Sequence, residues 1–182
     1  MKIGRLLLRL SVGGFFIGHG TQKLFGWFDG HGLEATAKSF EQLGLRPGKA
    51  NAIAAGAAEA GGGALLAAGL ATPLAASVLT ATMLTAIETV HGKNGPWLNK
   101  GGYEYNVVLI AAALLLVEAG PGGLSLDAVR GRERSGSRWA LAALLTGALG
   151  ALVAHVAAAA APLPPAEADA DASTAQQEAQ PA

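Results

Sequence analysis

VVLIAAALLLV, residues 107–117, contains no polar side chain and lies within an apolar segment at about residues 103–119. Four more apolar segments occur at about 4–28, 50–71, 74–90 and 139–161. A helix needs roughly 20 predominantly apolar residues to cross a bilayer, and several of these segments approach that length. The sequence therefore predicts an all-α membrane protein with a four-helix transmembrane bundle and a fifth, C-terminal transmembrane helix.

The composition favours a membrane protein and restricts its chemistry. Hydrophobic residues make up 51% of the 182 residues and charged residues 14%, with a mean hydropathy of +0.37, whereas roughly 25% of a soluble domain is charged. The formal net charge is zero, so we expect no nucleic-acid partner. The chain has no cysteine, which excludes thiol redox chemistry. A redox role would need a cofactor, a quinone, a metal on oxygen and nitrogen ligands, or a partner protein.

The chain divides into a four-helix domain and C-terminal additions. The domain covers residues 1–127 and includes an amphipathic surface helix at about 33–43, where apolar residues recur at helical spacing among charged ones. A basic loop follows at 128–138, and the extra transmembrane helix occupies 139–161. Residues 162–182 combine proline, alanine and glutamine with acidic residues and no basic ones, so we expect a disordered tail.

Basic residues and glycines suggest how the helices are arranged. Basic clusters at 2–9 and 130–138 adjoin segment ends, so the positive-inside rule predicts a cytoplasmic N-terminus and an external C-terminus. No small-residue cleavage signal follows the first apolar run, so we expect a retained signal-anchor helix. The pattern Gly14-x-x-x-Gly18 and the run 61–63 (GGG) predict close helix contacts.

Ionisable residues of four segments should lie at a similar depth. If the helices alternate in direction, these residues collect near the outer ends of the first four segments: His19, Lys23, Glu59, Glu88, His91 and Glu104. A charged side chain inside a bilayer costs roughly 2.5–3.5 kcal/mol, and such groups usually face a bundle interior or cavity. The alignment therefore predicts a polar pocket at this level.

Glu59 is the clearest member of this set, because it lies within a segment of alanine and glycine. One interpretation is a buried carboxylate that carries a proton or holds a polar ligand. The other is an ion pair with Lys23 or His19 that pins two helices together. His19 and Lys23 are one helical turn apart and share a face. They can take part in proton exchange, or Lys23 can extend to the interface while His19 bonds a carbonyl.

The remaining candidates have both structural and functional interpretations. Glu88 and His91 share a helical face and form an alternative metal pair, although a capped helix end explains them more simply. Glu104 opens a segment, where a carboxylate meets the helix dipole favourably. Trp97, Tyr103 and Tyr105 lie near the same boundary, where an interfacial aromatic belt is expected. They are also candidates for the wall of a quinone pocket.

An ordered set of short motifs resembles the DoxX family of bacterial membrane proteins, over about two thirds of the chain. The set comprises GHGTQKLFG at 18–26, Glu59 followed by two glycines, HG at 91–92, GYEYN at 102–106 and PGGLSLD at 121–127. The resemblance implies a four-helix bundle in the bacterial plasma membrane that assembles with protein partners into quinone-linked oxidoreductases. The fifth segment and the tail depart from this four-helix core.

Three functions remain open at this point. The first is a subunit of a quinone-linked membrane oxidoreductase or of a redox-detoxification assembly, in which His19, Lys23, Glu59 and Glu104 exchange protons with a quinone or a small oxidant. The second is a non-catalytic anchor or assembly subunit whose buried charges form a structural network. The third is a transporter of a small solute or of protons, although the sequence lacks the repeats of common transporters.

Overall fold

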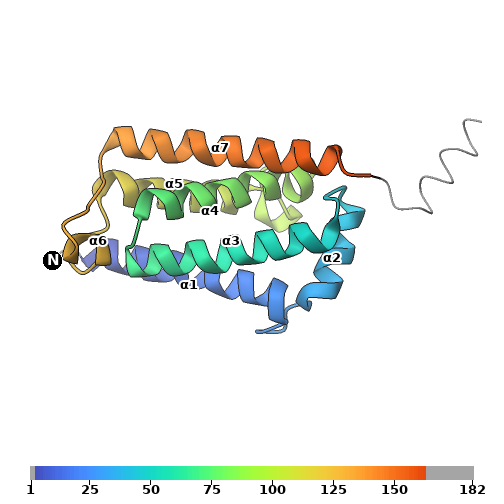
Figure 1. Cartoon of the computed structure of the whole chain (residues 1–182), viewed down its shortest axis with the longest axis horizontal. Coiled ribbons are helices and arrows are strands. Elements are labelled where there is room, and N and C mark those ends of the chain that lie inside the picture. Colours follow the sequence, from blue (N-terminus) through green and yellow to red (C-terminus); the bar gives the residue numbers. More distant parts are fainter. Residues whose placement is uncertain (1–2, 163–182) are drawn as a thin grey trace, which may run out of the picture.

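The computed structural model describes residues 3–162 and is helical, with no strand in that range (Figure 1). Apart from Pro162, the tail predicted to be disordered lies outside the described residues. Ten helical elements are present: α1 (Ile3–Phe25), α2 (Gly32–Gln42), α3 (Gly48–Ala68), α4 (Thr72–Ala86), the π-helical turn η1 (Ile87–His91), the 3-10 turns η2 (Gly92–Asn94) and η3 (Leu98–Lys100), α5 (Glu104–Ala119), α6 (Leu126–Val129) and α7 (Ser137–Ala159).

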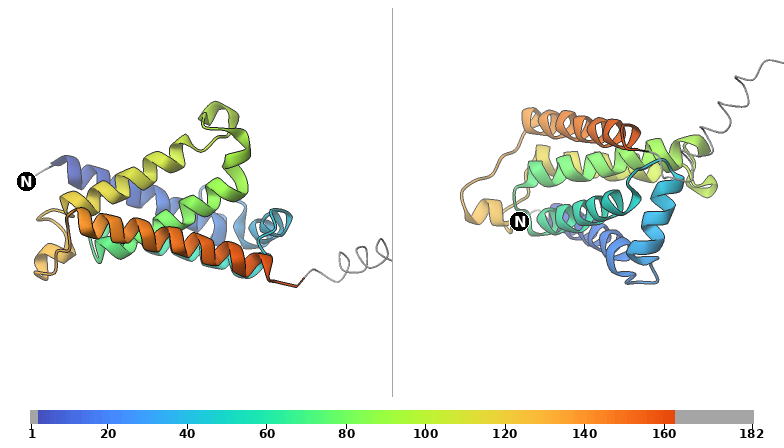
Figure 2. Two further views of the ribbon diagram at one scale, coloured as in Figure 1. Left: turned by 90° about the horizontal axis from the view of Figure 1, so that it is seen from above. Right: turned by 45° about the vertical axis from the view of Figure 1, so that its right-hand side comes forward.

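The five long helices run lengthwise side by side, and two short helices mark the ends of the bundle (Figure 1). Helix α2 and the loop that joins α4 to α5 both lie at one end of the bundle. We call this end the α2 end. Helix α6 lies at the opposite end, the α6 end (Figure 2). Helix α2 occupies the region where the amphipathic pattern predicts a surface helix, and it packs against α3 and α1.

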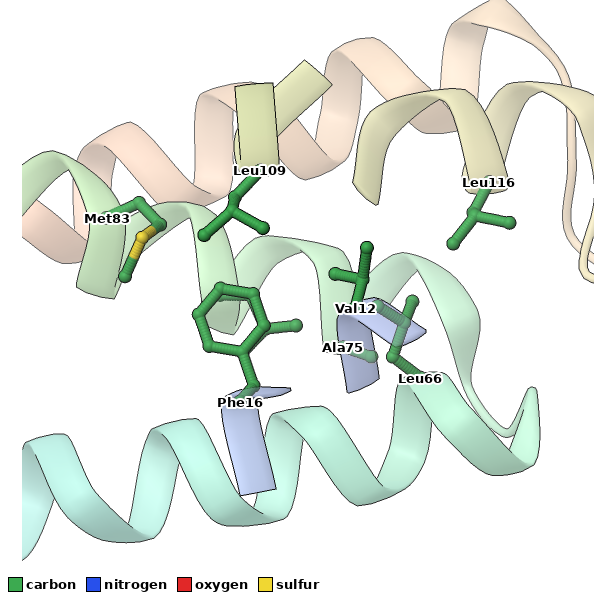
Figure 3. Packing of buried hydrophobic residues seen from close by; sticks show 8 residues of the cluster. Val12, Phe16, Leu66, Ala75, Met83, Leu109 and Leu116 are labelled. Carbon is green, nitrogen blue, oxygen red and sulfur yellow. The ribbon is translucent and has the colours of Figure 1, made fainter. Parts of the chain in front are cut away.

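One apolar cluster holds the first four long helices together. Phe16 of α1 is 1% exposed and lies among side chains of α4 and α5 (Figure 3). The cluster consists of Val12, Phe16, Leu66, Ala75, Leu79, Met83, Leu109 and Leu116. Each of α1, α3, α4 and α5 contributes to it, so the predicted four-helix bundle is confirmed as the core of the fold.

Helices α1 and α3 make the closest helix contact, and glycine makes it possible. A Cβ atom on Gly20 would lie 2.5 Å from Gly56 O, and one on Gly13 would lie 2.6 Å from Gly63 O. The prediction that Gly14 and Gly18 make the close contact was therefore wrong, because a Cβ atom on either would meet nothing within 4 Å. Gly13 and Gly20, on another face of α1, make it instead. The spacing of glycines did not reveal which face of α1 meets α3.

Helix α7 adds a fifth member through a separate contact with α4 and α5. A Cβ atom on Gly147 would lie 2.7 Å from Thr80 Cβ, so α7 approaches α4 as closely as its backbone allows. A second apolar cluster joins the three helices: Ala76, Ala113, Val117 and Ala143. Helix α7 is not among the close neighbours of α1 or α3.

The outer surface of the bundle suits lipid rather than water. Large apolar side chains along α7 are exposed, including Leu145 (60%), Leu149 (59%) and Val153 (59%), and soluble proteins rarely expose such a continuous surface. Within residues 3–162, two helical stretches are long and apolar enough to cross a bilayer, 72–94 and 137–159. The other three long helices do not meet this criterion. Helix α5 has only 16 residues, and the charges and many glycines of α1 and α3 lower their hydropathy. The predicted all-α membrane fold is confirmed.

Arg9 and Asp127 close the α6 end with buried hydrogen bonds. Arg9 Nε donates to Ala67 O (2.9 Å), Nη1 to Pro121 O (2.8 Å) and Nη2 to Leu124 O (2.6 Å). Asp127 accepts hydrogen bonds from the backbone N–H groups of residues 71 and 72 (2.9 and 3.0 Å), at the start of α4. Gly69 lies between the two sites with φ of 62°, and a Cβ atom there would lie 2.6 Å from Arg9 Nη1.

Candidate functional site

An ion pair between α1 and α3 is the centre of the candidate site. Lys23 Nζ lies 2.6 Å from Glu59 Oε2, and the two side chains are 26% and 7% exposed. Lys23 belongs to the last turn of α1, whereas Glu59 lies roughly 16 Å along α3 from its first residue. The glycine contact around Gly20 brings the two backbones close enough for the pair to form. Pairing offsets part of the cost of burying each charge.

Two cavities lie on either side of this pair. The α7 cavity, of about 330 Å³, is bounded by α3, α4 and α7. The α5 cavity, of about 260 Å³, is bounded by α1, α4 and α5. Lys23, Glu59, Ala86 and His91 line both of them. The ion pair therefore forms part of a shared wall, and both of its side chains face space that a ligand or water can occupy.

The α5 cavity is polar near its rim. His19 lines it, and His19 Nδ1 lies 3.2 Å from Gln22 Oε1. Tyr105 also lines it, together with Asn106, which is 6% exposed and whose Nδ2 donates to Met83 Sδ at 3.4 Å. The structure thus brings His19, Lys23 and Glu59 together, as the sequence predicts, and adds an amide that the sequence analysis did not single out.

His91 lines both cavities and has a defined orientation. Its Nδ1 lies 2.8 Å from Gly101 O. A carbonyl oxygen accepts only, so Nδ1 carries the hydrogen, and in a neutral ring Nε2 is then an acceptor. The bond fixes the ring against the loop that joins α4 to α5, and His91 can take up a proton at Nε2.

Glu104 lies apart from the ion pair. Its Oε1 accepts a hydrogen bond from Leu98 N at 2.7 Å, and it lines a separate surface depression with Trp97, Asn99 and Lys100. Leu98 in turn lines the α5 cavity. Glu104 therefore does not line the α5 cavity itself and is connected to it only through its hydrogen bond to Leu98. Of the three aromatic candidates, Tyr105 lines the α5 cavity, whereas Trp97 and Tyr103 line neither of the two cavities.

Glu88 and His91, the alternative metal pair, have different partners. Glu88 Oε1 lies 3.0 Å from Nδ1 of His155 on α7, whereas His91 bonds the loop carbonyl of Gly101. The π-helical turn that contains both residues rotates them relative to the predicted α-helical register. Across residues 3–162, no three or more histidine, aspartate or glutamate side chains gather as a ligand set for a metal ion.

Comparison with known proteins gives the family. The sequence model of the DoxX family matches residues 4–92. A Bacillus subtilis (strain 168) protein named "Putative oxidoreductase CatD" is 35% identical over 126 residues, which cover 69% of this chain and 86% of that protein. The chain belongs to the DoxX family. No solved structure matches it.

The DoxX match covers one part of the site and leaves out another. His19, Lys23, Glu59, Glu88 and His91 fall within residues 4–92. Helix α5, with Tyr105 and Asn106, follows that range, as does α7. The ion pair thus belongs to the part of the chain that matches the DoxX model, whereas one wall of each cavity comes from helices beyond it.

Proposed function

We propose that this DoxX-family chain is a subunit of a quinone-linked oxidoreductase in the bacterial plasma membrane. In this proposal the Lys23–Glu59 pair and the histidines at positions 19 and 91 exchange protons with the quinone head group. The observation that carries it is the location of the pair: Glu59 is buried, Lys23 is partly buried, and both side chains line two cavities. A pair that served packing alone would have no need of cavities on both sides.

The chemistry of a quinone matches the groups present. Reduction of a quinone to a quinol adds two electrons and two protons, and a proton donor near each carbonyl oxygen assists the reaction. Lys23, and His91 once it is protonated at Nε2, can each donate one proton to a quinone oxygen. The Glu59 carboxylate can then take up a replacement proton from water at the outer side and pass it to Lys23 through their 2.6 Å contact. We assign the two electrons to a redox-active partner subunit; the chain has no cysteine and so has no thiol redox couple of its own. The printed name of the Bacillus subtilis relative supports a redox setting.

The same proposal assigns the α2 end to the outer side of the membrane. The basic segment 130–138 connects α6 to α7 at the α6 end of the bundle. The positive-inside rule therefore favours the cytoplasm for that end. Protons would then be exchanged at the outer side. Glu104 takes a positioning role in this scheme, through its hydrogen bond to Leu98 N.

An anchor or assembly subunit is the second candidate. The short, buried contact of Lys23 with Glu59 favours it, since such a pair can pin α1 to α3 with no further role. The two candidates differ in what Glu59→Gln would do. Under either candidate the variant loses the ion pair between α1 and α3 and is less stable. A redox subunit would still fold and insert but would lose its bound quinone, whereas an anchor would have no quinone to lose and would lose partner binding.

The test begins with protein purified in mild detergent. Its lipid extract is analysed for quinone, and the protein is assayed for iron, copper and manganese. The proposal predicts stoichiometric quinone in the wild-type protein and its loss in folded Glu59→Gln protein. Stoichiometric metal without quinone would contradict the proposal. Absence of both would favour the anchor.

A further inference from the structure

The α7 cavity differs from the α5 cavity in the side chains that line most of its length. Beyond the ion pair and His91, its walls are mainly small and apolar, with alanines from α3 and with Gly150 and Ala154 from α7. The remaining polar side chains along the wall are Asn51 of α3, Thr82 and Thr85 of α4, and Thr89 of η1. Thr82 and Thr89 each donate their hydroxyl hydrogen to a carbonyl of their own helix, at 2.9 and 2.8 Å. The cavity is therefore charged at one wall and apolar over most of the rest.

The cavity also has a side opening between two helices that are not close neighbours. Helix α7 packs on α4 and α5, and α4 packs on α3, but α3 and α7 are not among the closely packed pairs. Ala54 lines the cavity and is exposed, and Ala58 and Ala154 on the facing helices are partly exposed. Both helices present apolar side chains to the bilayer on either side of this gap, such as Ile53 and Val153. The gap therefore faces lipid.

Phe40 and Leu45 limit the cavity at the α2 end. Phe40 belongs to α2 and Leu45 to the segment between α2 and α3. A long apolar chain in the cavity is thus directed sideways between α3 and α7, rather than out through the α2 end. Small side chains on both walls leave room for a branched chain, which larger residues would fill.

We propose that the α7 cavity holds the isoprenoid tail of the quinone whose head group meets Lys23, Glu59 and His91, and that α7 thereby makes the site selective for tailed quinones. This inference rests on the proposed function, since the quinone is the ligand proposed there. Helix α7 lies beyond the DoxX match at residues 4–92, so the tail-binding wall is an addition to the matched part of the chain. A phospholipid acyl chain is the competing occupant.

The test uses two probes that differ in the tail: a menaquinone with a short isoprenoid tail, and menadione, its tail-less ring. Binding is measured by quenching of tryptophan fluorescence in full-length protein in detergent. Ala154→Phe fills the cavity from α7, and Ala58→Leu narrows it from α3. Ala148→Phe is the matched control, because Ala148 is exposed on the same helix and does not line the cavity.

The inference predicts that Ala154→Phe weakens binding of the tailed menaquinone by about tenfold or more and leaves menadione binding unchanged. Ala58→Leu should act in the same direction, which keeps the test valid if the first variant does not fold. Ala148→Phe should bind both probes as the wild type does. Unchanged menaquinone binding in folded Ala154→Phe and Ala58→Leu would overturn the inference and leave the proposed function standing, and a phospholipid recovered with the protein would then identify the occupant. A wild-type protein that binds neither probe would overturn both.

Discussion

Lys23 and Glu59 form a largely buried ion pair at 2.6 Å, with side chains that are 26% and 7% exposed, whereas Lys49 and Glu34 form an exposed pair of nearly the same length, 2.7 Å. The side chains of the second pair are 61% and 80% exposed. Both pairs lie toward the α2 end of the same bundle and join a lysine to a glutamate. The exposed pair is therefore an internal control for every experiment on the buried one.

Loss of Glu59 should cost more stability than loss of Glu34. Glu59→Gln leaves the Lys23 ammonium beside a neutral amide in a largely buried site, and we expect a loss of about 3 kcal/mol in the free energy of unfolding. Glu34→Gln should cost less than about 1 kcal/mol, because its pair is screened by solvent. Thermal unfolding in detergent measures both. Equal effects would show that burial of the pair has no energetic consequence.

Gly20 should not tolerate a methyl group, although Gly18 should. A Cβ atom at Gly20 would lie 2.5 Å from Gly56 O, whereas one at Gly18 would meet nothing within 4 Å. We expect Gly20→Ala to destabilise the protein by about 1–3 kcal/mol. Gly18→Ala should stabilise α1 by roughly 0.5–1 kcal/mol, because alanine has the higher helix propensity. The two melting temperatures give the comparison, and a reversed order would contradict the observed register of α1 on α3.

Arg9 should be replaceable by neither lysine nor glutamine. Its guanidinium donates to three carbonyls, one near the end of α3 and two in the loop between α5 and α6, a geometry that an ammonium group cannot reproduce. Both Arg9→Lys and Arg9→Gln should lower the free energy of unfolding by about 2–3 kcal/mol. Arg132→Gln, on the exposed loop, should have little effect. Near-native melting of Arg9→Lys would show that charge alone is sufficient.

Glu104→Ala should loosen the loop at the α2 end without unfolding the bundle. The substitution removes the acceptor for Leu98 N, so amide hydrogen exchange should rise at residues 95–103. Glu118→Ala, which removes an acceptor for Ser137 at the α6 end, should leave exchange in that loop unchanged. Protection that survives in Glu104→Ala would remove the positioning role assigned to Glu104.

Hydropathy was enough to predict the helices, because a bilayer demands long apolar segments. It did not predict which glycines touch, since α1 has glycines on several faces and the contact uses Gly13 and Gly20. The sequence offered a Lys23–Glu59 contact as one of several pairings, and the structure selects it. The alternating direction of the helices predicted that the ionisable groups lie at one end of the bundle. It did not predict how each helix is rotated about its axis, and so which way each group points.

Helix rotation explains what the sequence missed at the site. Glu104 turns toward its own loop, to Leu98 N, and Glu88 turns toward His155 of α7. The π-helical turn at 87–91 changes the directions in which Glu88 and His91 point relative to each other, and no sequence pattern predicts such a turn. Asn106 is buried in the α5 cavity and bonds Met83, whereas in the sequence it stood out only as part of the motif at 102–106.

The measurement that tests the central claim most directly is the quinone content of a charge-swapped protein, Lys23→Glu/Glu59→Lys, alongside its melting temperature. The swap keeps an ion pair between α1 and α3 but exchanges the proton donor and acceptor that face the cavities. We predict a melting temperature close to that of the wild type and above that of Glu59→Gln, with the bound quinone still lost. A swapped protein that regains both stability and quinone would contradict the account, because the pair would then act only as a pin between two helices.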